Sequence, residues 1–390
     1  MSDSGPGHPV RRIGILGGGQ LARMMALAGV PLGFHFDILD PAEDACAGAA
    51  GRLVRAGFDD ADAAAELAGQ VDVMTYDFEN VPATTAGAAA GRVSFHPCVT
   101  ALDACQDRLA EKNLLTRLGI PVPPFHAVDG RTDLLEAVDR FGYPCVLKTR
   151  RFGYDGKGQA VLRGPEDLEH AWQELGDHPL IAEAFVAFDA ECSLIAVRAR
   201  DGRTGFWPLS HNLHDAGMLV LSEACIAGGD LQAQAEDIGN RLIEHFDYVG
   251  VIAVEFFVTD GRLSVNEIAP RVHNSGHWTI DGAVTSQFEN HLRAISGLPL
   301  GSTALDRPSV MFNWIGAMPD AGELLGLEGL HWHDYGKKAR PGRKVGHATL
   351  VLPDEQQLGK QAQALAARLG GAWPDRWSRF STARGRLAGD

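Results

Sequence analysis

The sequence is poor in positive charge, in cysteine and in long apolar runs. Lys and Arg number 35 against 50 Asp and Glu, so the 390-residue chain has a formal net charge of −15. A charge of this size repels nucleic acid and anionic membrane surfaces. We therefore expect no nucleic-acid or membrane partner, and an anionic ligand must be held by a local cluster of basic residues.

The six cysteines form no C-x-x-C pair and are too sparse for a disulfide framework in a chain of this length. They are expected to act as small buried hydrophobes in a reducing compartment. Residues 1–11 form a polar tail without the apolar stretch of a signal peptide. No apolar run approaches the ~20 residues that span a bilayer, so the expected location is the cytoplasm.

Predicted strands alternate with helix-forming segments near the N-terminus, at Arg12–Leu16, His35–Asp40 and Val71–Tyr76. This alternation predicts an open parallel sheet in an α/β domain over residues 12–118. A Gly/Pro cluster at residues 119–124 marks the first domain boundary.

The remainder is predicted to be α+β in character. Short strands around one glycine-rich loop predict a lid subdomain at about residues 121–185, inside a domain covering 119–310. Alternating strands after residue 186 predict an antiparallel sheet. Residues 311–390 are predicted to form a small C-terminal β-rich domain with a helix near Glu355–Leu369.

Gly17-Gly18-Gly19 follows the first strand and leads into a helical sequence. Together with Ala22, and with Asp40 about twenty residues on, it fits the dinucleotide fingerprint. A nicotinamide oxidoreductase therefore stays an open alternative. The chain lacks the second half of such a domain, however, and a glycine turn at a helix N-terminus also binds substrate phosphates, which we favour.

A second glycine-rich loop, Phe152–Gln159 (FGYDGKGQ), lies between two predicted strands, and we call it the flap. Its three glycines let backbone N–H groups face phosphate oxygens, and Lys157 adds positive charge. Lys148 ends the preceding strand, where it can reach phosphates as a fixed charge. A plain surface hairpin is the alternative interpretation.

Glu255 and Glu267 put carboxylates on predicted neighbouring strands, and Arg271 follows closely. Two hard oxygen ligands beside a triphosphate suit Mg²⁺, and an adjacent Arg can stabilise a transferring phosphoryl group. A Glu on a strand is ordinarily only part of its exposed face, but Glu255 lies between apolar residues.

The one dense basic cluster comes late in the chain: Lys337, Lys338, Arg340, Arg343 and Lys344. Charge runs are usually solvated faces. The turn Pro341-Gly342 within the cluster favours a shaped loop for an anionic ligand instead.

Taken in order, Lys148, the flap, Glu183–Val186, Glu191, Glu255 and Asn266-Glu267 resemble the ATP-grasp carboxylate–amine ligases. The strings YDFENVP, RFGYDGKGQ, NEIAPRVHNSGHWT and PGRKVGH are similar to those of the N5-carboxyaminoimidazole ribonucleotide synthetases, over about residues 12–352. The resemblance implies an ATP-grasp fold and an ATP- and bicarbonate-dependent carboxylation of aminoimidazole ribonucleotide through carboxyphosphate, in purine biosynthesis. It also implies Mg²⁺ and a homodimer.

The resemblance further implies roles for individual residues. The ATP site would comprise Arg108, Lys148, Gly153, Tyr154, Asp155, Gly156, Lys157, Gly158, Gln159, Glu183, Ala184, Phe185, Val186, Glu191, His214, Asn266 and Glu267. The Mg²⁺ ligands would be Glu255 and Glu267. The ribonucleotide would contact Gly19, Gln20, Leu21, Glu79, Ser275, Lys337, Arg343 and Lys344. The catalytic residues would be Tyr154, Asp155, Lys157, Arg271, His273 and Asn274.

One departure from the family pattern is visible, since Phe152 stands where the family usually has a glycine. Two other interpretations stay open. One is another ATP-grasp ligase, such as a formate-dependent glycinamide ribonucleotide transformylase or a biotin carboxylase. The other is a non-catalytic nucleotide-binding protein, against which the retained carboxylates and Lys148 argue.

Overall fold

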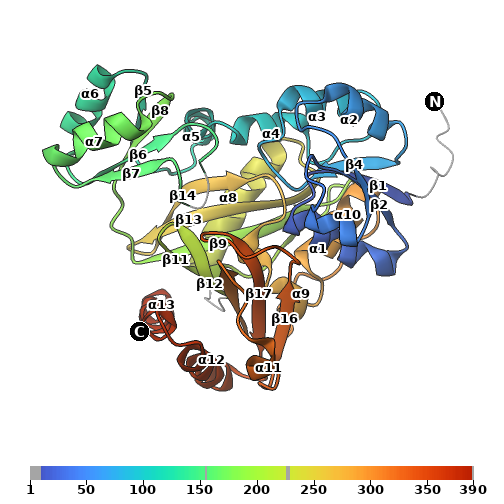
Figure 1. The fold of residues 1–390 in the computed structure, drawn as a ribbon. Coiled ribbons are helices and arrows are strands. Elements are labelled where there is room, and N and C mark those ends of the chain that lie inside the picture. The colour runs from blue at the N-terminus through green and yellow to red at the C-terminus, as the bar shows by residue number, and fades with distance from the viewer. Residues whose placement is uncertain (1–9, 154–155, 225–228, 389–390) are drawn as a thin grey trace.

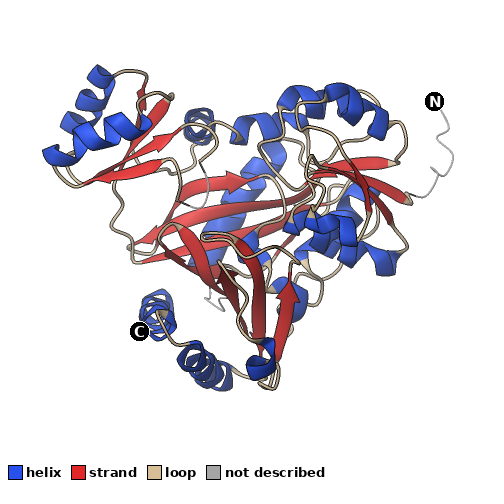
Figure 2. Cartoon of the chain, viewed as in Figure 1, coloured by secondary structure: helices blue, strands red, loops and turns tan. Residues whose placement is uncertain are grey.

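The computed structural model describes residues 10–153, 156–224 and 229–388. Three sheets organise this part of the chain (Figure 1). Figure 2 shows helices around each of them. The predicted fold class is confirmed, with a parallel sheet first and antiparallel sheets after it.

The N-terminal sheet is parallel and has the order β3-β2-β1-β4. Its strands are β1 Arg12–Leu16, β2 His35–Leu39, β3 Arg52–Val54 and β4 Val73–Tyr76. Its helices are α1 Gln20–Gly29, α2 Ala61–Ala68, α3 Ala83–Ala90, α4 Val99–Cys105 and α5 Arg108–Arg117. The short strand β3 was not predicted. The Asp107 carboxylate caps the start of α5, accepting from the N–H groups of Leu109 and Ala110.

The lid is a separate four-stranded antiparallel sheet of order β5-β8-β6-β7. Its strands are β5 Phe125–Val128, β6 Cys145–Thr149, β7 Gln159–Leu162 and β8 Leu180–Ala184, and its helices are α6 Arg131–Phe141 and α7 Pro165–Leu175. The flap joins β6 to β7. Phe152 has a φ of 62°, so a bulky residue holds the left-handed conformation that favours glycine.

The third sheet has nine strands among the described residues, in the order β14-β13-β9-β11-β12-β15-β17-β16, with β10 paired to β9. Its strands are β9 Ala190–Arg198, β10 Thr204–Phe206, β11 Ser210–Asp215, β12 Met218–Ala224, β13 Gly250–Thr259, β14 Arg262–Ala269, β15 Ser309–Ile315, β16 Leu330–Asp334 and β17 Lys344–Val351. The helices of this region are α8 Asp230–His245, α9 Thr279–Gly282, α10 Gln287–Ser296, α11 Ala321–Leu324, α12 Glu355–Leu369 and α13 Trp373–Ala388.

The structure adds detail to the predicted antiparallel sheet. Residues 205–213 contain parts of two strands, β10 and β11, on either side of Pro208, which has no N–H for a ladder. The helices α8 and α13 were not predicted. The C-terminal strands form no sheet of their own, because β15 pairs with β12 and continues the central sheet. Two helices, α12 and α13, then close the chain.

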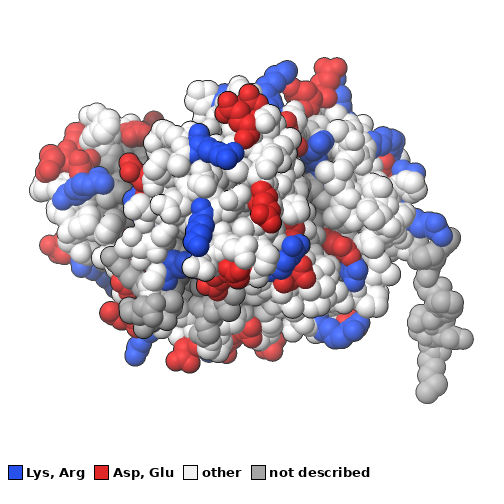
Figure 3. All heavy atoms as spheres, turned by 90° about the horizontal axis from the view of Figure 1, so that it is seen from below, with Lys and Arg blue, Asp and Glu red and all other residues white. Residues whose placement is uncertain are grey.

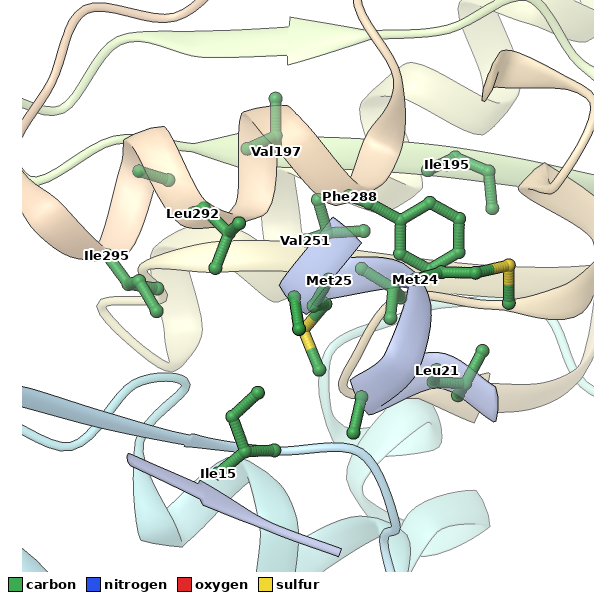
Figure 4. Packing of buried hydrophobic residues seen from close by; sticks show 14 of the residues in the cluster. Ile15, Leu21, Met24, Met25, Ile195, Val197, Val251, Phe288, Leu292 and Ile295 are labelled. Atoms are coloured by element: carbon green, nitrogen blue, oxygen red, sulfur yellow. The ribbon is translucent and has the colours of Figure 1, made fainter. Parts of the chain in front are cut away.

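One hydrophobic core ties the N-terminal sheet to the central sheet (Figure 4). Leu21, Met24 and Met25 of α1 face Phe288 and Leu292 of α10. Residues from β9 and β13 lie against the same cluster, and all of these side chains are at most 6% exposed. The packing fixes the start of α1 relative to the central strands, and the site is built between these two parts.

The face in Figure 3 carries both signs of charge, interspersed among neutral residues. The cysteines within the described residues are free thiols, as expected: Cys46, Cys98, Cys105, Cys145 and Cys192. No helix in the described ranges is both long and apolar enough to cross a membrane.

Candidate active site

A cavity of about 810 Å³ lies where the flap, the N-terminal sheet and the central sheet meet. Most of its lining residues are polar or charged: Gln20, Asp40, Asp77, Glu79, Asn80, Gln106, Arg108, Glu111, Arg150, Lys157, Glu267, Arg271, His273, Asn274, Lys337, Arg340, Arg343 and Lys344. Gly19, Leu21, Phe152 and Gly153 also line it. These residues are up to 325 positions apart in the sequence, from Gly19 to Lys344. The cavity therefore brings the flap and the basic cluster into one space.

The two predicted metal carboxylates are direct neighbours across a strand pair. Glu255 of β13 pairs in register with Glu267 of β14, and the ladder shifts immediately after Glu255. Burial, reinforced by the nearby Glu267 and only partly offset by His214, raises the pKa of Glu255 to about 7. Two crowded carboxylates of which one resists ionisation are typical of a site that receives a cation.

Glu267 has a fixed cationic partner. Arg108 NH1 lies 3.0 Å from Glu267 Oε2, and the same guanidinium is 3.5 Å from the carbonyl oxygen of Gly153 in the flap. Burial opposes ionisation of Glu267, but Arg108 outweighs it and lowers the pKa of this carboxyl. Arg108 thus connects the carboxylate pair to the base of the flap.

A buried network of three charged residues links the lid strands β6 and β8 to α5. Lys148 Nζ donates to Glu183 Oε2 at 2.9 Å, and Lys112 Nζ lies 3.8 Å from the same oxygen. Burial would raise the pKa of Glu183, but Lys148 and Lys112 lower it to about 2. Lys112, which no motif in the sequence marks, donates to the carbonyl oxygens of Val265 and Asn266. Its role depends on α5 packing against β14, a contact between distant segments.

Glu191 and His214 form a second charged pair on adjacent strands. The two side chains approach to 3.1 Å. Burial disfavours the imidazolium, but Glu191 and then Glu255 outweigh it and raise the pKa of His214 to about 9. Each of the predicted nucleotide residues Lys148, Glu191 and His214 therefore has a charged partner at a defined distance.

Arg271 is held by Glu79, with Nε 2.5 Å from Glu79 Oε2. Burial opposes both charges, yet the pair lowers the pKa of Glu79 and raises that of Arg271. Beside them, burial and then Arg271 lower the pKa of His273 well below its usual value. His273 is thus a neutral imidazole next to a permanent cation, and its Nε2 is 3.7 Å from Glu255.

Ser275 does not line the cavity. Its hydroxyl is fully buried and lies 2.7 Å from the Ser193 hydroxyl and 2.9 Å from His273 Nδ1. Asn274 does line the cavity, and its amide contacts His277 and Asn313. Ser275 therefore supports His273 from behind, and the expectation that it touches the ribonucleotide directly is not met in this geometry.

The first glycine turn is already bonded to two carboxylates. Asp40 Oδ2 accepts from the Gly18 N–H at 2.7 Å, and Asp77 Oδ2 accepts from the Gly19 and Ala22 N–H groups at 2.8 and 3.2 Å. Gly17 has a φ of 101°, and a Cβ there would collide with Asp77. These backbone donors are not open to a phosphate as expected, and Asp40 is not placed to bind a ribose. Both findings weaken the dinucleotide interpretation.

The basic cluster forms a loop that faces this turn. Lys337 Nζ donates to Gln20 Oε1, while Lys338 Nζ is bound to Asp44 at the surface, 3.0 Å away. Burial lowers the pKa of Lys337. Arg340, Arg343 and Lys344 complete this wall of the cavity. The predicted substrate residues Gly19, Gln20, Leu21, Glu79, Lys337, Arg343 and Lys344 therefore all line this cavity.

Some predicted residues lie elsewhere or cannot be described. Tyr154 and Asp155 lie outside the described residues, so their predicted roles stay predictions. Phe185 follows β8 and is 47% exposed. Arg150, Glu111 and Asn80 line the cavity but were not predicted. Asn80 lies in the string YDFENVP and was overlooked, whereas no local motif marks Arg150 or Glu111.

Comparison with known proteins decides which family this arrangement belongs to. Residues 10–106 match the ribonucleotide synthetase preATP-grasp domain, 113–288 the ATP-grasp domain and 309–361 the phosphoribosylaminoimidazole carboxylase C-terminal domain. The N5-carboxyaminoimidazole ribonucleotide synthase of Pseudomonas aeruginosa is 54% identical over 347 residues, which are 89% of this chain and 96% of that protein. The chain belongs to the N5-carboxyaminoimidazole ribonucleotide synthase family.

Solved structures of the family agree. The synthetase from Thermus thermophilus superposes with a TM-score of 0.87 at 52% identity, covering 92% of this chain and 98% of that chain. The Aspergillus clavatus synthase, solved with ADP and 5-aminoimidazole ribonucleotide, has a TM-score of 0.85 at 29% identity, covering 95% and 99%. The resemblance inferred from the motifs is confirmed.

Proposed function

We propose that this family member is an ATP-dependent carbon–nitrogen ligase that carboxylates 5-aminoimidazole ribonucleotide to N5-carboxyaminoimidazole ribonucleotide, consuming bicarbonate and releasing ADP and phosphate. One observation carries the proposal. A single cavity has Glu267 and Arg271 at one end and the loop Lys337–Lys344 at the other. An activated carboxyl group and a phosphorylated amine would meet between them.

The nucleotide would lie between the lid and the central sheet. Lys148 and Arg108 would hold its phosphates, and Lys157 in the flap would cover them. The chain at Glu183–Val186 would bind adenine through its backbone, and Glu191 would accept from the ribose hydroxyls. The Glu183 side chain is bound to Lys148 and is therefore not available to the base.

The residues present fit a magnesium ion. Glu255 and Glu267 would supply two carboxylate oxygens, and the buried Asn266 Oδ1 beside them has no hydrogen-bond partner among the described residues. Bound there, Mg²⁺ would supply positive charge to the phosphate oxygens. Burial disfavours the ionised form of the Glu255 carboxyl, and a bound cation would favour it.

Arg271, His273 and Asn274 would act on the bicarbonate. Bicarbonate oxygen attacks the γ-phosphorus of ATP in line, the bond to ADP breaks, and carboxyphosphate forms. Arg271 would stabilise the charge of the transferring group, and His273, which burial and Arg271 keep neutral, would offer a hydrogen bond rather than a charge. Carboxyphosphate then releases phosphate and CO₂, and the amine attacks CO₂ to form the carbamate. The flap would exclude water, because carboxyphosphate hydrolyses readily.

The ribonucleotide phosphate would bind the basic loop. Lys337, Arg343 and Lys344 provide the only clustered positive charge at this end of the cavity among the described residues. Glu79 would contact the ribose or imidazole while it holds Arg271. Tyr154 and Asp155 of the flap are proposed to face the amine and the bicarbonate.

An assay of ADP release tests the function. ADP should form only when aminoimidazole ribonucleotide and bicarbonate are both present, with one ribonucleotide consumed per ADP. ADP release that depends on formate and glycinamide ribonucleotide would instead identify a transformylase. Nucleotide binding without turnover under every condition would identify a non-catalytic binder. Asp155→Asn at the wild-type rate would exclude Asp155 as the proton acceptor.

A homodimer is proposed as the assembly on family grounds. Light scattering coupled to size exclusion checks this, with a mass near 41.7 kDa excluding it, since that is the mass of one chain.

A further inference from the structure

The last helix, α13, lies beyond the region that the family models match. The C-terminal domain match ends at residue 361, whereas α13 spans Trp373–Ala388. Figure 1 shows α13 beside α12, below β11 and β12. Nothing in the reaction described above uses this helix.

Two arginines of α13 hold one carboxylate at the end of β11. Arg376 Nε lies 2.8 Å from Asp215 Oδ2, and Arg379 NH2 lies 3.1 Å from Asp215 Oδ1. The Arg376 guanidinium also lies over the Trp373 ring, 5.0 Å from its centroid, which restrains it for this contact. Since both carboxylate oxygens are engaged, Asp215 is fixed in orientation as well as in position.

A buried ring contact holds the other end of the same strand. Phe380 of α13 is fully buried and stacks on His211 at 4.3 Å between ring centroids. His211 and Asp215 are four residues apart on β11. α13 therefore contacts β11 at two points along the strand.

Alternate residues of β11 point to opposite faces of the sheet. His211 and Asp215 face α13, whereas Asn212 and His214 face the nucleotide side. Asn212 donates to Ser193, which is bonded to Ser275 behind His273, and His214 pairs with Glu191. Along β11, the residues that α13 contacts therefore alternate with residues that face the site.

The turn after Asp215 also contacts the flap. Gly156 has a φ of 77°, and a Cβ on it would lie 2.9 Å from the carbonyl oxygen of Ala216 and 3.1 Å from the Gly217 Cα. Ala216 itself has a φ of 50°, an uncommon conformation for a residue other than glycine. The turn Ala216–Gly217 is therefore the surface on which this part of the flap rests, one residue from the carboxylate that α13 holds.

We propose that α13 is a positioning element for the nucleotide site: by fixing Asp215 and His211 it sets the place of His214 and of the turn that supports Gly156. Arg376 and Arg379 are positioning residues and touch no substrate. The inference rests on the proposed ATP site, because it assigns α13 to the strand that carries His214.

The test compares ADP affinity, measured by calorimetry on the full chain, between the wild type and Arg376→Gln/Arg379→Gln. Since coupled contacts shift binding by a few-fold to tenfold, we expect about a fivefold weaker Kd for ADP. In turnover, KM for ATP should rise by a similar factor with KM for the ribonucleotide unchanged. ADP released per ribonucleotide consumed should also rise, because a displaced turn supports the flap less well.

Three further variants separate positioning from stability. Arg384→Gln changes the same charge on the same helix but breaks the contacts with Glu223 and Glu355, 3.4 and 2.8 Å away. It should lower Tm and leave the Kd for ADP unchanged. Asp215→Asn should reproduce the double variant and add nothing when combined with it, and Arg376→Lys/Arg379→Lys should recover most of the affinity.

An unchanged Kd for ADP in Arg376→Gln/Arg379→Gln would overturn the proposal, as would a loss of equal size in Arg384→Gln. Full additivity with Asp215→Asn would also contradict it. The proposed function fails separately: if the wild type binds ADP but releases none with ribonucleotide and bicarbonate, the reaction is wrong while the calorimetry still decides the role of α13.

Discussion

The two ends of the cavity are built in different ways. At the nucleotide end charged side chains are paired within the protein: Glu183 is buried with Lys148, and Glu267, which is partly exposed, is bound to Arg108. At the ribonucleotide end the charges come from one surface loop, and the glycine turn opposite is closed by Asp40 and Asp77. The first end is preorganised for triphosphate and metal, whereas the second gains its main partner when the substrate phosphate arrives.

Because of this difference, the loss of one charge should affect stability and ligand binding differently at the two ends. A buried pair that loses one member leaves the other without compensation, which lowers both stability and activity. An exposed basic residue that is lost affects mainly the binding of its anion. Substitutions at the two ends should therefore differ in the ratio between their effects on stability and on KM.

The largest effect is expected for Glu255→Gln at the nucleotide end. Loss of one metal carboxylate should reduce kcat by about 10²- to 10³-fold, as for the loss of one electrostatic group in other sites. Tm should change little, because burial already favours the neutral form of this side chain. The rate of ADP formation at saturating magnesium measures it, and a rate within threefold of the wild type would exclude Glu255 as a ligand.

Lys148→Met comes next. It leaves Glu183 buried, with Lys112 as its remaining cation 3.8 Å away, so unfolding free energy should fall by about 3 kcal/mol. KM for ATP should rise as well. Urea denaturation checks the stability, and Lys148→Met/Glu183→Gln serves as the control because removing both charges should restore part of the loss. If Lys148→Met proves as stable as the wild type, the preorganisation described for this end is wrong.

At the ribonucleotide end, Arg343→Gln should raise KM for aminoimidazole ribonucleotide by about tenfold, equivalent to one charge-assisted hydrogen bond. Tm and KM for ATP should stay the same, because among the described residues the Arg343 guanidinium bonds one backbone carbonyl oxygen, that of Lys338, at 3.3 Å. Steady-state kinetics at two salt concentrations measures the effect, and the matched variant is Lys338→Gln, whose charge lies beside Asp44. A rise in KM for ATP would show that the two ends are not separate.

The smallest effect concerns pH. Burial, partly offset by the N–H groups of Ala22 and Gly19, raises the pKa of Asp77 to about 6 from 3.8. The folded protein therefore holds this proton more tightly, and the contribution of Asp77 to stability falls as pH rises from 3.8 to 6 and is constant above. Between pH 5 and pH 7 the loss should be about 1 kcal/mol, and Asp77→Asn should remove it.

Glu183 provides the contrast from the nucleotide end. Its pKa is lowered to about 2, so its stabilising contribution is present above pH 4.5 and is lost only as pH falls from there towards 2. Glu255, whose pKa is raised to about 7, also titrates between pH 5 and pH 7, so the contribution of Asp77 is the difference between the wild type and Asp77→Asn over this range. A pH dependence of the same size in both proteins would exclude Asp77 as its source.

The sequence allowed the nucleotide end to be predicted in detail, because its residues lie in recognisable strings on alternating strands. Glu255 and Glu267 were expected on neighbouring strands, and they pair directly in register. Lys112 could not be found in this way, since its partners Val265 and Asn266 are brought to it only by the packing of α5 on β14.

The errors have the same origin. The glycine turn looked open to a phosphate, but Asp77 reaches it from another strand, 58 residues away. The pairing of the C-terminal strands was also missed: β15 pairs with β12 of the central sheet, and a strand pattern does not reveal its neighbour in a sheet. α8 was different: Ala235, Ile238 and Leu242 have helical spacing and are buried, so its signal was present and was overlooked.

The continuity of the central sheet has a further consequence. Glu267 lies on β14 at one edge, and Lys344 begins β17 near the other, in the same hydrogen-bonded ladder. The distance between Glu267 and Lys344 is thus set by one sheet. Movement of the lid would shift Lys148 and the flap, but it would leave that distance unchanged.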